Sequence, residues 1–570
     1  MNQPSDLKLN KNDPSIKSQI VPPSDDFWHQ QFVILKQDYT LLLDRLSLIL
    51  QTNAALHVEI QTLKDEIARL KGTSPRPKLP PNCLEGKGSD SGGTKDGDIT
   101  GRGKYPRKNK TGLNFQQIVR LKPDNLPKGA KYKDAHKYDV QDIVYHAFNT
   151  RYLIERWELP DGTFVHGELP SHVQGHYGAA LRAHVLQLAH ASRVTEELIL
   201  EQLKSCKIAI SAGQLSKMLT EGHEAFHIEK EEILKAALES GQIQTDDVGT
   251  RHKAKNCYTN VICSEFFVYL STTESKSRIN FLTILSQGRH EYRFNRDALD
   301  YLKVHKGAEK LIQALSIRDG LVINTLEAEK AFLNEIGYLN ATEMRLMIEA
   351  GLFASLIEHG VPRDLHIHSD DAGQFELFKN SLCWIHEERH YRKLVPAHPE
   401  IATEIEKVRD GIWHFYKDLK AYKETPTEQE CIRLSQVFDD LFKPKQPSPY
   451  QVINNRLALT YAKRDRLLCV LDHPETPLHN NNSEIGGRGA KIKSKISGGT
   501  RTDQGRRAWD TFGSLNLTCR RLGISFYDFL MDRLLNLKKI ASLGSIITEK
   551  IQPVASRNLV NDLAIALSAA

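Results

Sequence analysis

The chain has 570 residues, of which 40% are hydrophobic and 26% charged, so it is long enough for several domains with buried cores. This composition excludes a collagen-like chain, a wholly disordered chain and a disulfide scaffold. With 77 Lys and Arg against 71 Asp and Glu, the formal net charge of +6 is too small to indicate a nucleic-acid partner by itself.

The eight cysteines are scattered and form no Cys-x-x-Cys pair, which excludes a zinc ribbon and a thioredoxin motif. Such spacing is typical of reduced thiols in a cytosolic protein. The polar N-terminus lacks the apolar segment of a signal peptide, and no run approaches the roughly 18 apolar residues that span a membrane. We therefore expect a cytoplasmic protein without membrane contact.

Residues 1–26 are polar, which predicts a disordered N-terminus. Residues 27–71 carry apolar side chains every seven positions, and this period predicts a leucine-zipper coiled coil. The alternative is an amphipathic helix packed on its own domain, which needs no strict heptad. A polar Asn in the seam favours a parallel dimer in one register. The seam residues expected to mediate dimerisation are Leu35, Leu42, Ile49, Asn53, Leu56, Leu63 and Leu70.

Residues 72–112 form a linker that is rich in Gly, Ser, Pro and Lys and ends in a basic run. Arg102, Lys104 and Arg107 in this run could follow a phosphate backbone or enter a minor groove. The favoured interpretation is a solvated tether with incidental DNA affinity.

Residues 113–173 are expected to form a small β-rich domain, with a hairpin around the Pro160-Asp161-Gly162 turn. Residues 174–240 read as helical, and their centre predicts a helix, a tight turn and a second helix. Ser211 would N-cap the second helix, with Gln214 and Lys217 facing a DNA groove. An ordinary helical hairpin explains this segment nearly as well. The apolar residues expected to hold the pair are Leu200, Leu203, Ile208, Ile210, Leu215 and Leu219.

Two extended segments, residues 242–247 and 366–371, alternate apolar and polar residues and then end in Thr/Ser-Asp-Asp. Because neighbouring side chains of a strand point to opposite faces, one Asp of each pair can face a common site. Two β-rich runs, CYTNVICS and EFFVYLSTT, follow the first pair and predict the next strands of the same sheet.

A third acidic residue, Glu484, follows an Asn-rich turn and is expected in the first turn of a helix. The stretch after it is strongly basic, which suits a polyanionic substrate. The residues of this stretch expected to contact DNA are Arg488, Lys491, Lys493 and Arg501.

Three converging carboxylates would repel one another, and hard divalent cations relieve that repulsion. Two Mg²⁺ or Mn²⁺ ions per site would suit in-line phosphoryl transfer on a nucleic acid. Taken singly, each acid is more often a turn or cap residue, and Asn481 with Glu484 has capping-box spacing. Two matching strand ends beside a basic helix start make catalysis the better interpretation.

A further cluster, Cys383-Trp384-Ile385-His386, has a Cys and a His on one helix face. Two ligands are too few for a zinc site. We therefore expect Cys383 and Trp384 to pack and His386 to form hydrogen bonds near the acidic site.

These motifs, in this order, resemble the bacterial insertion-sequence transposases of the insertion-sequence-sixty-six (TnpC-like) type, which are DDE enzymes. The resemblance covers most of residues 27–535. It rests on the zipper and SPRPK linker, GHYGAALRAHVLQLAHASRVTEELILEQL, the Thr-Asp-Asp segment, SDDAGQF followed by CWIHEERH, and HNNNSEIGGRGAKIKSKISGGTRTDQGRRAWDTF. A cysteine-rich segment that relatives often carry before the catalytic domain is missing, because residues 113–140 contain no cysteine.

The resemblance implies a multidomain α+β/α protein with an RNase H-like α/β catalytic core over residues 241–535. Asp246, Asp370 and Glu484 match the three catalytic, metal-binding acids. The site-supporting residues are Cys383, Trp384, His386, Asn480 and Asn481. The wide separation of the acids along the chain indicates helical insertions near 290–362 and 390–475, and residues 536–570 are expected to be a C-terminal tail.

The expected activity is divalent-metal-dependent cleavage and strand transfer of DNA by a bacterial, nucleoid-associated transposase. The expected partners are double-stranded DNA at element ends and targets, a second copy bound through the coiled coil (or a higher oligomer), and accessory transposition proteins. Two alternatives stay open. One is a non-catalytic DNA-binding protein derived from a transposase, and the other is an RNase H-fold nuclease without strand transfer.

Overall fold

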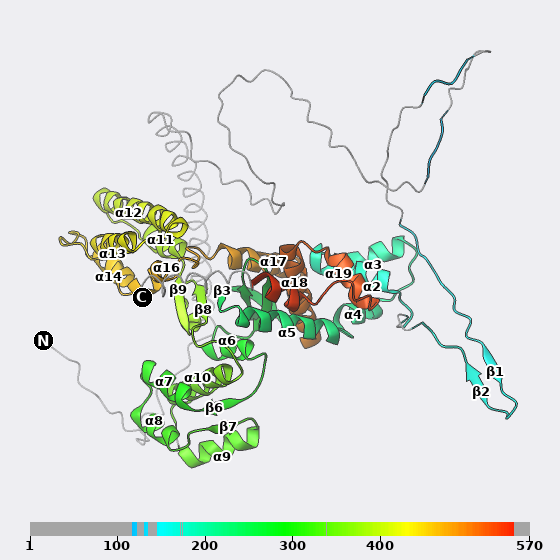
Figure 1. The fold of residues 1–570 in the computed structure, drawn as a ribbon, viewed down its shortest axis with the longest axis horizontal. Coiled ribbons are helices and arrows are strands. Elements are labelled where there is room, and N and C mark those ends of the chain that lie inside the picture. Colours follow the sequence, from blue (N-terminus) through cyan, green and yellow to red (C-terminus); the bar gives the residue numbers. More distant parts are fainter. Residues whose placement is uncertain are drawn as a thin grey trace, which may run out of the picture. The chain divides into compact units, whose positions relative to one another are not determined.

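The computed structural model describes residues 117–121, 130–134, 145–170, 173, 175–337 and 339–551. Internal contacts divide the chain into residues 1–135 and 136–570, and all elements below belong to the second unit (Figure 1). The expected N-terminus, coiled coil and linker lie outside the described residues. The predictions that fall there concern Leu35, Leu42, Ile49, Asn53, Leu56, Leu63, Leu70, Arg102, Lys104 and Arg107.

A five-stranded mixed sheet forms the centre of this unit, with the strand order β5-β4-β3-β8-β9. Strands β3, β4 and β5 are antiparallel, whereas β8 runs parallel to β3 and β9 parallel to β8. The two predicted β-rich runs are confirmed as β4 and β5. The strands are β3 (Gln242–His252), β4 (Lys255–Cys263), β5 (Val268–Thr273), β8 (His366–Ser369) and β9 (Lys379–Leu382).

Strand β3 is longer than the sequence pattern predicts. It continues past Asp246 to His252 and pairs with β4 down to His252↔Lys255. The two turn residues between these strands, Lys253 and Ala254, have φ of 49° and 62°, which is the left-handed geometry of a tight two-residue hairpin. Placing the first acidic pair at a strand end was therefore wrong, because the hairpin ladder extends the strand well beyond it.

Helix α17 (Asn481–Ser497) packs closely against β3 and β4. Its Gly486 and Gly487 make this approach possible, because a Cβ at Gly487 would lie 2.3 Å from Val248 Cγ2 and one at Gly486 3.1 Å from Val261 Cγ1. The small cluster beneath the helix consists of Val248, Val261, Cys263, Val268, Leu270, Ala490 and Leu517.

Helix α18 (Asp503–Leu522) covers the edge strand β5. Three buried side chains spaced four residues apart accept hydrogen bonds from alternate β5 amides: Asp510 from Thr272, Ser514 from Leu270 and Thr518 from Val268, at 2.8 to 3.1 Å. An open sheet edge presents unpaired N–H groups, and this row of acceptors satisfies them.

In the larger core, helices from distant parts of the chain pack against the sheet. Its buried residues include Ile233, Ile243, Phe281, Phe512 and Phe529. The helices that contribute to it are α5 (Glu224–Glu239), α6 (Arg278–Leu285), α10 (Ala341–Glu358), α18 and α19 (Phe526–Leu534).

The predicted helix, turn and helix are confirmed as α3 (Glu196–Ser205) and α4 (Ala212–Thr220), and Ser211 caps α4 in a capping box with Gln214. All six apolar residues predicted to hold the pair together belong to one cluster. This cluster also takes in α2 (Ala179–Leu186) and a π-helical turn, η2 (Gln187–Ala191).

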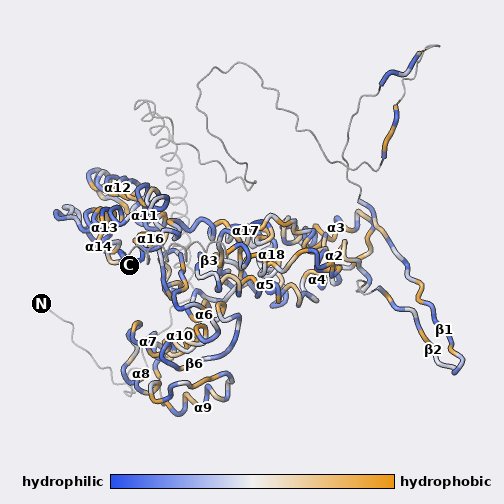
Figure 2. The backbone as a smooth tube through the Cα atoms, in the orientation of Figure 1, coloured by the Kyte–Doolittle hydropathy of each residue, from blue (hydrophilic) through white to orange (hydrophobic). Residues whose placement is uncertain are grey.

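The predicted hairpin is present but short, with β1 (Arg156–Glu158) paired to β2 (Phe164–His166) around Gly162, whose φ is 80°. Its large apolar side chains are exposed, Trp157 by 64%. Figure 2 shows hydrophobic stretches along this hairpin.

The first insertion was predicted to be helical, but it also contains a two-stranded sheet. In this sheet Tyr292 pairs with Ile323, whose side chain is only 1% exposed. The buried Phe294 ring stacks on the ring of Phe332. Its elements are β6 (Tyr292–Phe294), α7 (Arg296–Val304), α8 (Glu309–Ser316), β7 (Leu321–Ile323), α9 (Leu326–Ile336) and α10.

The second insertion is helical and has its own apolar core around Trp384, Phe415, Phe438 and Phe442. Figure 2 shows hydrophobic and hydrophilic residues alternating along α12, as a helix with one buried face requires. The helices are α11 (Trp384–Arg392), α12 (Pro399–Glu424), α13 (Glu428–Phe442), α14 (Gln451–Tyr461), α15 (Arg464–Leu467) and α16 (Cys469–Asp472).

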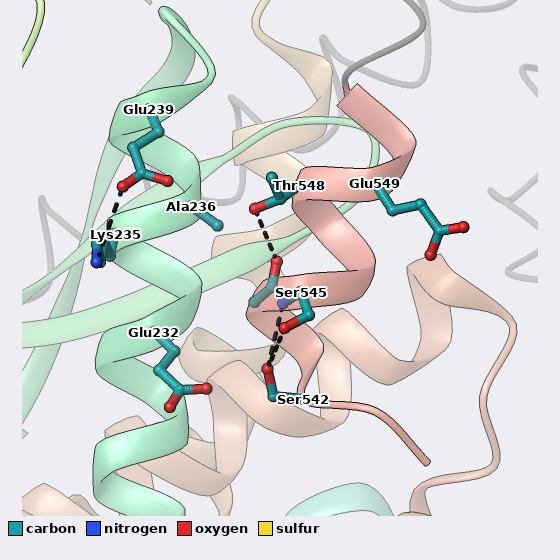
Figure 3. A pocket seen from close by; sticks show the side chains of 9 residues that line it. Glu232, Lys235, Ala236, Glu239, Ser542, Ser545, Thr548 and Glu549 are labelled. Atoms are coloured by element: carbon teal, nitrogen blue, oxygen red, sulfur yellow. Dashed lines mark hydrogen bonds and ion pairs between the residues drawn. The ribbon is translucent and has the colours of Figure 1, made fainter.

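The segment after α19 is not a tail throughout. Residues 543–551 are helical, and Leu543 and Ile547 are fully buried in the main core. A pocket of about 480 Å³ lies between this segment and α5, lined among others by Glu232, Lys235 and Ser545 (Figure 3). In the described part of the chain, no helix is both long and apolar enough to cross a membrane.

The glycine contact beneath α17 predicts that Gly487→Ala lowers the free energy of unfolding by about 1–3 kcal/mol, because the new Cβ overlaps Val248. Gly213→Ala is the matched control, since this helical glycine has open space around it and Ala favours helix. Thermal unfolding of both variants checks this. An equal effect of the two substitutions would contradict the packing argument.

Candidate active site

Asp246 and Asp370 lie level with each other on adjacent parallel strands. The ladder between β3 and β8 pairs Gln242 with His366 and Gln244 with His368. Asp246 and Asp370 keep the same offset two residues further on, where Asp370 directly follows β8. Since alternate residues of a strand share a face, Asp246 lies on the α17 side together with Val248.

Glu484 lies in the first turn of α17, as predicted. The start of this helix is tied to β3, because the Asn480 Nδ2 donates to the Thr245 carbonyl at 2.7 Å. The Asn480 amide also donates to Cys383 Sγ at 3.2 Å. The Glu484 amide donates to the Asn480 carbonyl at 3.2 Å. The predicted capping-box alternative is wrong, because the helix begins after Asn480 without a side-chain cap.

Burial and mutual repulsion act on these carboxylates. Burial, opposed by a hydrogen bond from the Asp247 amide, raises the pKa of Asp246 to about 7, and the negative charges of Asp370, Asp247 and Glu484 add to the shift. Burial likewise raises the pKa of Asp370. The fold therefore gathers negative charge in a desolvated place, which is unfavourable unless cations or protons balance it.

Helix α11 supplies the partners of Glu484. Arg389 Nη1 donates to Glu484 Oε1 at 3.1 Å, and His386 Nε2 lies 3.5 Å from the same oxygen. Burial lowers the pKa of His386, and the nearby Arg389 charge lowers it further. Cys383 and Trp384 are almost fully buried, with Trp384 Nε1 donating to the Leu467 carbonyl at 3.1 Å. Asn481 is exposed at the first position of α17.

The second Asp of each pair has a cationic partner. Asp247 is paired with Lys276 and accepts a hydrogen bond from Gln374 Nε2, in η3 (Gly373–Phe375), at 2.7 Å. Asp371 is paired with Lys463 Nζ at 2.5 Å and with Arg466 Nη1 at 3.5 Å.

The same Lys463 Nζ lies 3.1 Å from Glu387 Oε2, so it links the second insertion to the strand end that carries Asp370. Sequence reasoning missed Lys276, Arg389 and Lys463, because no local pattern marks a lysine or arginine that meets its carboxylate across the fold.

Among the described residues, no group of three or more His, Cys, Asp and Glu side chains lies close enough together to hold one metal ion. The oxygen donors of Asp246, Asp370 and Glu484 are nevertheless the chemistry that Mg²⁺ and Mn²⁺ prefer. The raised pKa values of Asp246 and Asp370 mean that a nearby cation would stabilise the charged forms of these two carboxylates.

The basic residues after Glu484 fall into two groups. Arg488, Lys491 and Arg501 are exposed, and Lys491 Nζ donates to the Gly249 carbonyl at 2.9 Å. Lys493 instead points inward, donating to the Ala189 carbonyl at 2.7 Å and lying 4.7 Å from the centre of the Trp509 ring. The Lys493 side chain is half-buried and its Nζ is engaged with η2, and its predicted contact with DNA stays a prediction.

Gln214 and Lys217 are exposed on α4, as the helix-turn-helix interpretation requires. Gln214 Oε1 accepts a hydrogen bond from the Tyr177 hydroxyl at 2.9 Å, so part of this side chain is already occupied. These two residues belong to a separate element from the three acids.

Comparison with known proteins gives two matches. Residues 372–508 match the model of the family described as "Transposase IS66 family", a range that includes Glu484 and begins just after Asp370. A protein of Sinorhizobium fredii (strain NBRC 101917 / NGR234), described as "Uncharacterized protein y4jO", is 35% identical over 320 residues. This match covers 54% of the present chain and 96% of the relative.

The half-buried Lys493 predicts a pH-dependent stability. Burial lowers the pKa of Lys493 from 10.5 to about 7, so between these values the unfolded chain binds more protons than the folded chain. Stability is therefore lost as the pH falls through this window, and the loss is complete near pH 7. Lys493→Met should raise the thermal midpoint, and by more at pH 7.5 than at pH 9.5.

Lys495→Met, at an exposed position two residues further along α17, is the control and should show little change at either pH. A gain from Lys493→Met that is the same at both pH values would contradict the lowered pKa of Lys493.

Proposed function

The chain belongs to the IS66 family of transposases, and we propose that it is a DDE transposase in which Asp246, Asp370 and Glu484 carry DNA cleavage and strand transfer. The observation that carries this proposal is the parallel register of β3 and β8, which brings Asp246 level with Asp370, on the sheet that packs against the helix with Glu484 in its first turn.

The strand order supports the same assignment. Three antiparallel strands extended by two parallel strands, in the order β5-β4-β3-β8-β9, is the arrangement expected of an RNase H-like core. In such a core the first acid belongs to the central strand, the second to the end of its parallel neighbour and the third to a helix on the same face. Asp246, Asp370 and Glu484 occupy these positions.

The three acids would hold two Mg²⁺ or Mn²⁺ ions, since their oxygens suit these ions. When bound, such ions activate a water or a 3′-hydroxyl and stabilise the leaving oxygen of a phosphodiester. The chain's own residues prepare the site: Arg389 and His386 orient the Glu484 carboxylate, and the Asp247 amide orients Asp246.

Double-stranded DNA is the proposed substrate, at element ends and at the target. Arg488, Lys491 and Arg501 are exposed on or just after the helix of Glu484, where they could bind phosphates on either side of the cleaved bond. Helix α4 would bind the groove through Gln214 and Lys217. The predicted coiled coil would join two copies, so that two element ends come together.

A non-catalytic DNA-binding protein is the second candidate function. The observation that favours it is that, within the described residues, the acids are not close enough together to share one ion. The two candidates differ in whether the acids are needed for any measured activity.

Asp246→Asn, Asp370→Asn and Glu484→Gln should each reduce DNA cleavage by more than about 1,000-fold, because each removes a charged oxygen ligand without changing the side-chain size. The assay is Mn²⁺-dependent nicking of a plasmid that carries the DNA flanking this reading frame, together with DNA binding. Asp465→Asn is the control, since its side chain is 97% exposed. Cleavage at the wild-type rate by any of the three variants would refute the assignment of that acid.

Metal dependence gives a separate test that needs no DNA. Adding 5–10 mM Mn²⁺ to chelator-treated protein should raise its thermal midpoint, because a ligand that binds only the folded state stabilises it. The rise should be much smaller in the Asp246→Asn/Asp370→Asn double variant and unchanged in Asp465→Asn. Equal rises in all three proteins would mean that the acids do not hold the ions.

A further inference from the structure

The loop after η2 meets α17 near the proposed active site. Arg193, which follows this turn, has a left-handed backbone with φ of 60°. Its guanidinium lies over Gly489 of α17, where a Cβ would be 3.6 Å from Arg193 Nη2. Lys493, one turn further along α17, donates to the Ala189 carbonyl of η2 at 2.7 Å. These contacts hold η2 and its arginine against the helix of Glu484.

Helix α18 brings a second arginine to the same place. Near its end, Arg521 Nη2 donates to the Asn482 carbonyl at the start of α17 at 2.9 Å. Near its beginning, Trp509 packs against Lys493, which lies further along α17. The two helices therefore run in opposite directions, which brings the end of α18, where the exposed Arg520 lies, near the start of α17. Burial, and then the positive charge of Arg193, lower the pKa of Arg520.

This place has cations but no carboxylate partner. Within the part of the chain that the structure describes, neither Arg193 nor Arg520 forms a side-chain hydrogen bond or ion pair, although arginines elsewhere, such as Arg389 and Arg533, do. The buried His190 Nε2, next to Lys493, also has no hydrogen-bond partner. Neighbouring guanidinium groups without a counterion repel each other, and a bound anion relieves that repulsion.

We propose that Arg193 and Arg520 together bind one backbone phosphate of DNA at this junction. This phosphate-binding site, here called the phosphate seat, lies between the η2 turn and helices α17 and α18. The seat rests on the proposed function and extends it to residues outside the three acids. Two guanidinium groups from different elements can hold one phosphate through several charge-assisted hydrogen bonds.

The position of the seat suits this role. Gly489 follows Glu484 by five residues, which is about 7.5 Å along the helix axis. That length corresponds to about two nucleotides of duplex rise. A phosphate held here would fix the register between DNA bound by α3 and α4 and the strand presented to the acids.

The test is the salt dependence of DNA binding by the full-length protein. Fluorescence anisotropy of a labelled 30-base-pair duplex, between 50 and 300 mM KCl, gives the slope of log K against log salt. Arg193→Gly and Arg520→Gln should each reduce the steepness of this slope by about 0.9, as expected for one lost phosphate contact. The double variant should lose no more than either single variant, since both arginines would hold the same phosphate.

Arg193→Gly separates binding from folding. Glycine adopts a φ of 60° without strain, so this variant should keep or raise the thermal midpoint while it loses affinity. Loss of both stability and affinity would overturn the seat in favour of a structural role for Arg193. Arg296→Gln, at a 94% exposed arginine in the first insertion, is the control and should bind DNA like the wild type.

If the Arg193 and Arg520 variants show the same slope of log K against log salt as Arg296→Gln, the phosphate seat is overturned and the proposed function stays intact. A wild-type protein that does not bind DNA at all would overturn both. The thermal midpoint in 10 mM inorganic phosphate is a further check. If phosphate stabilises the wild type but not the two variants, while the salt dependence of DNA binding is unchanged, the site binds a small anion and the DNA assignment is overturned.

Discussion

The close packing of α17 on the β3–β4 hairpin is the contact on which the candidate site depends. Gly486 and Gly487 carry no side chain that would hold the helix away from Val248 and Val261. Asn480, just before the helix, is hydrogen-bonded to the strand one residue before Asp246. Glycines and one amide therefore determine how near Glu484 lies to the acids of the sheet, and neither feature is itself a chemical group of the proposed reaction.

Charge balance explains why elements from distant parts of the chain converge around the sheet. Half-buried carboxylates that lie near one another repel, and nearby cations relieve that repulsion. Lys276 pairs with Asp247, Arg389 with Glu484 and Lys463 with Asp371. The second insertion thus does more than fill the space between two motifs, because Arg389 of α11 reaches the third acid and Lys463, just after α14, reaches the second acid pair.

Helix α18 connects the stability of the sheet to the proposed DNA surface. Asp510, Ser514 and Thr518 seal the edge strand with side-chain acceptors. Four-residue spacing puts these three on one helix face, and Arg520 and Arg521 follow at the end of the same helix. A helix that is held by the sheet edge along its length can present its terminal arginines in a defined position beside α17.

The sequence by itself determined the local features: the strands β4 and β5, the capped helix α4, the helical start that carries Glu484, and the acidic residues themselves. Each depends on neighbours within a few residues, through alternation, capping or turn chemistry. Only the tertiary structure decided that β3 continues to His252, that Lys493 points inward, and that Leu543 and Ile547 belong to the core. The extension of β3 depends on its pairing with β4, whereas the positions of Lys493 and of the last helix depend on partners hundreds of residues away, which no local pattern records.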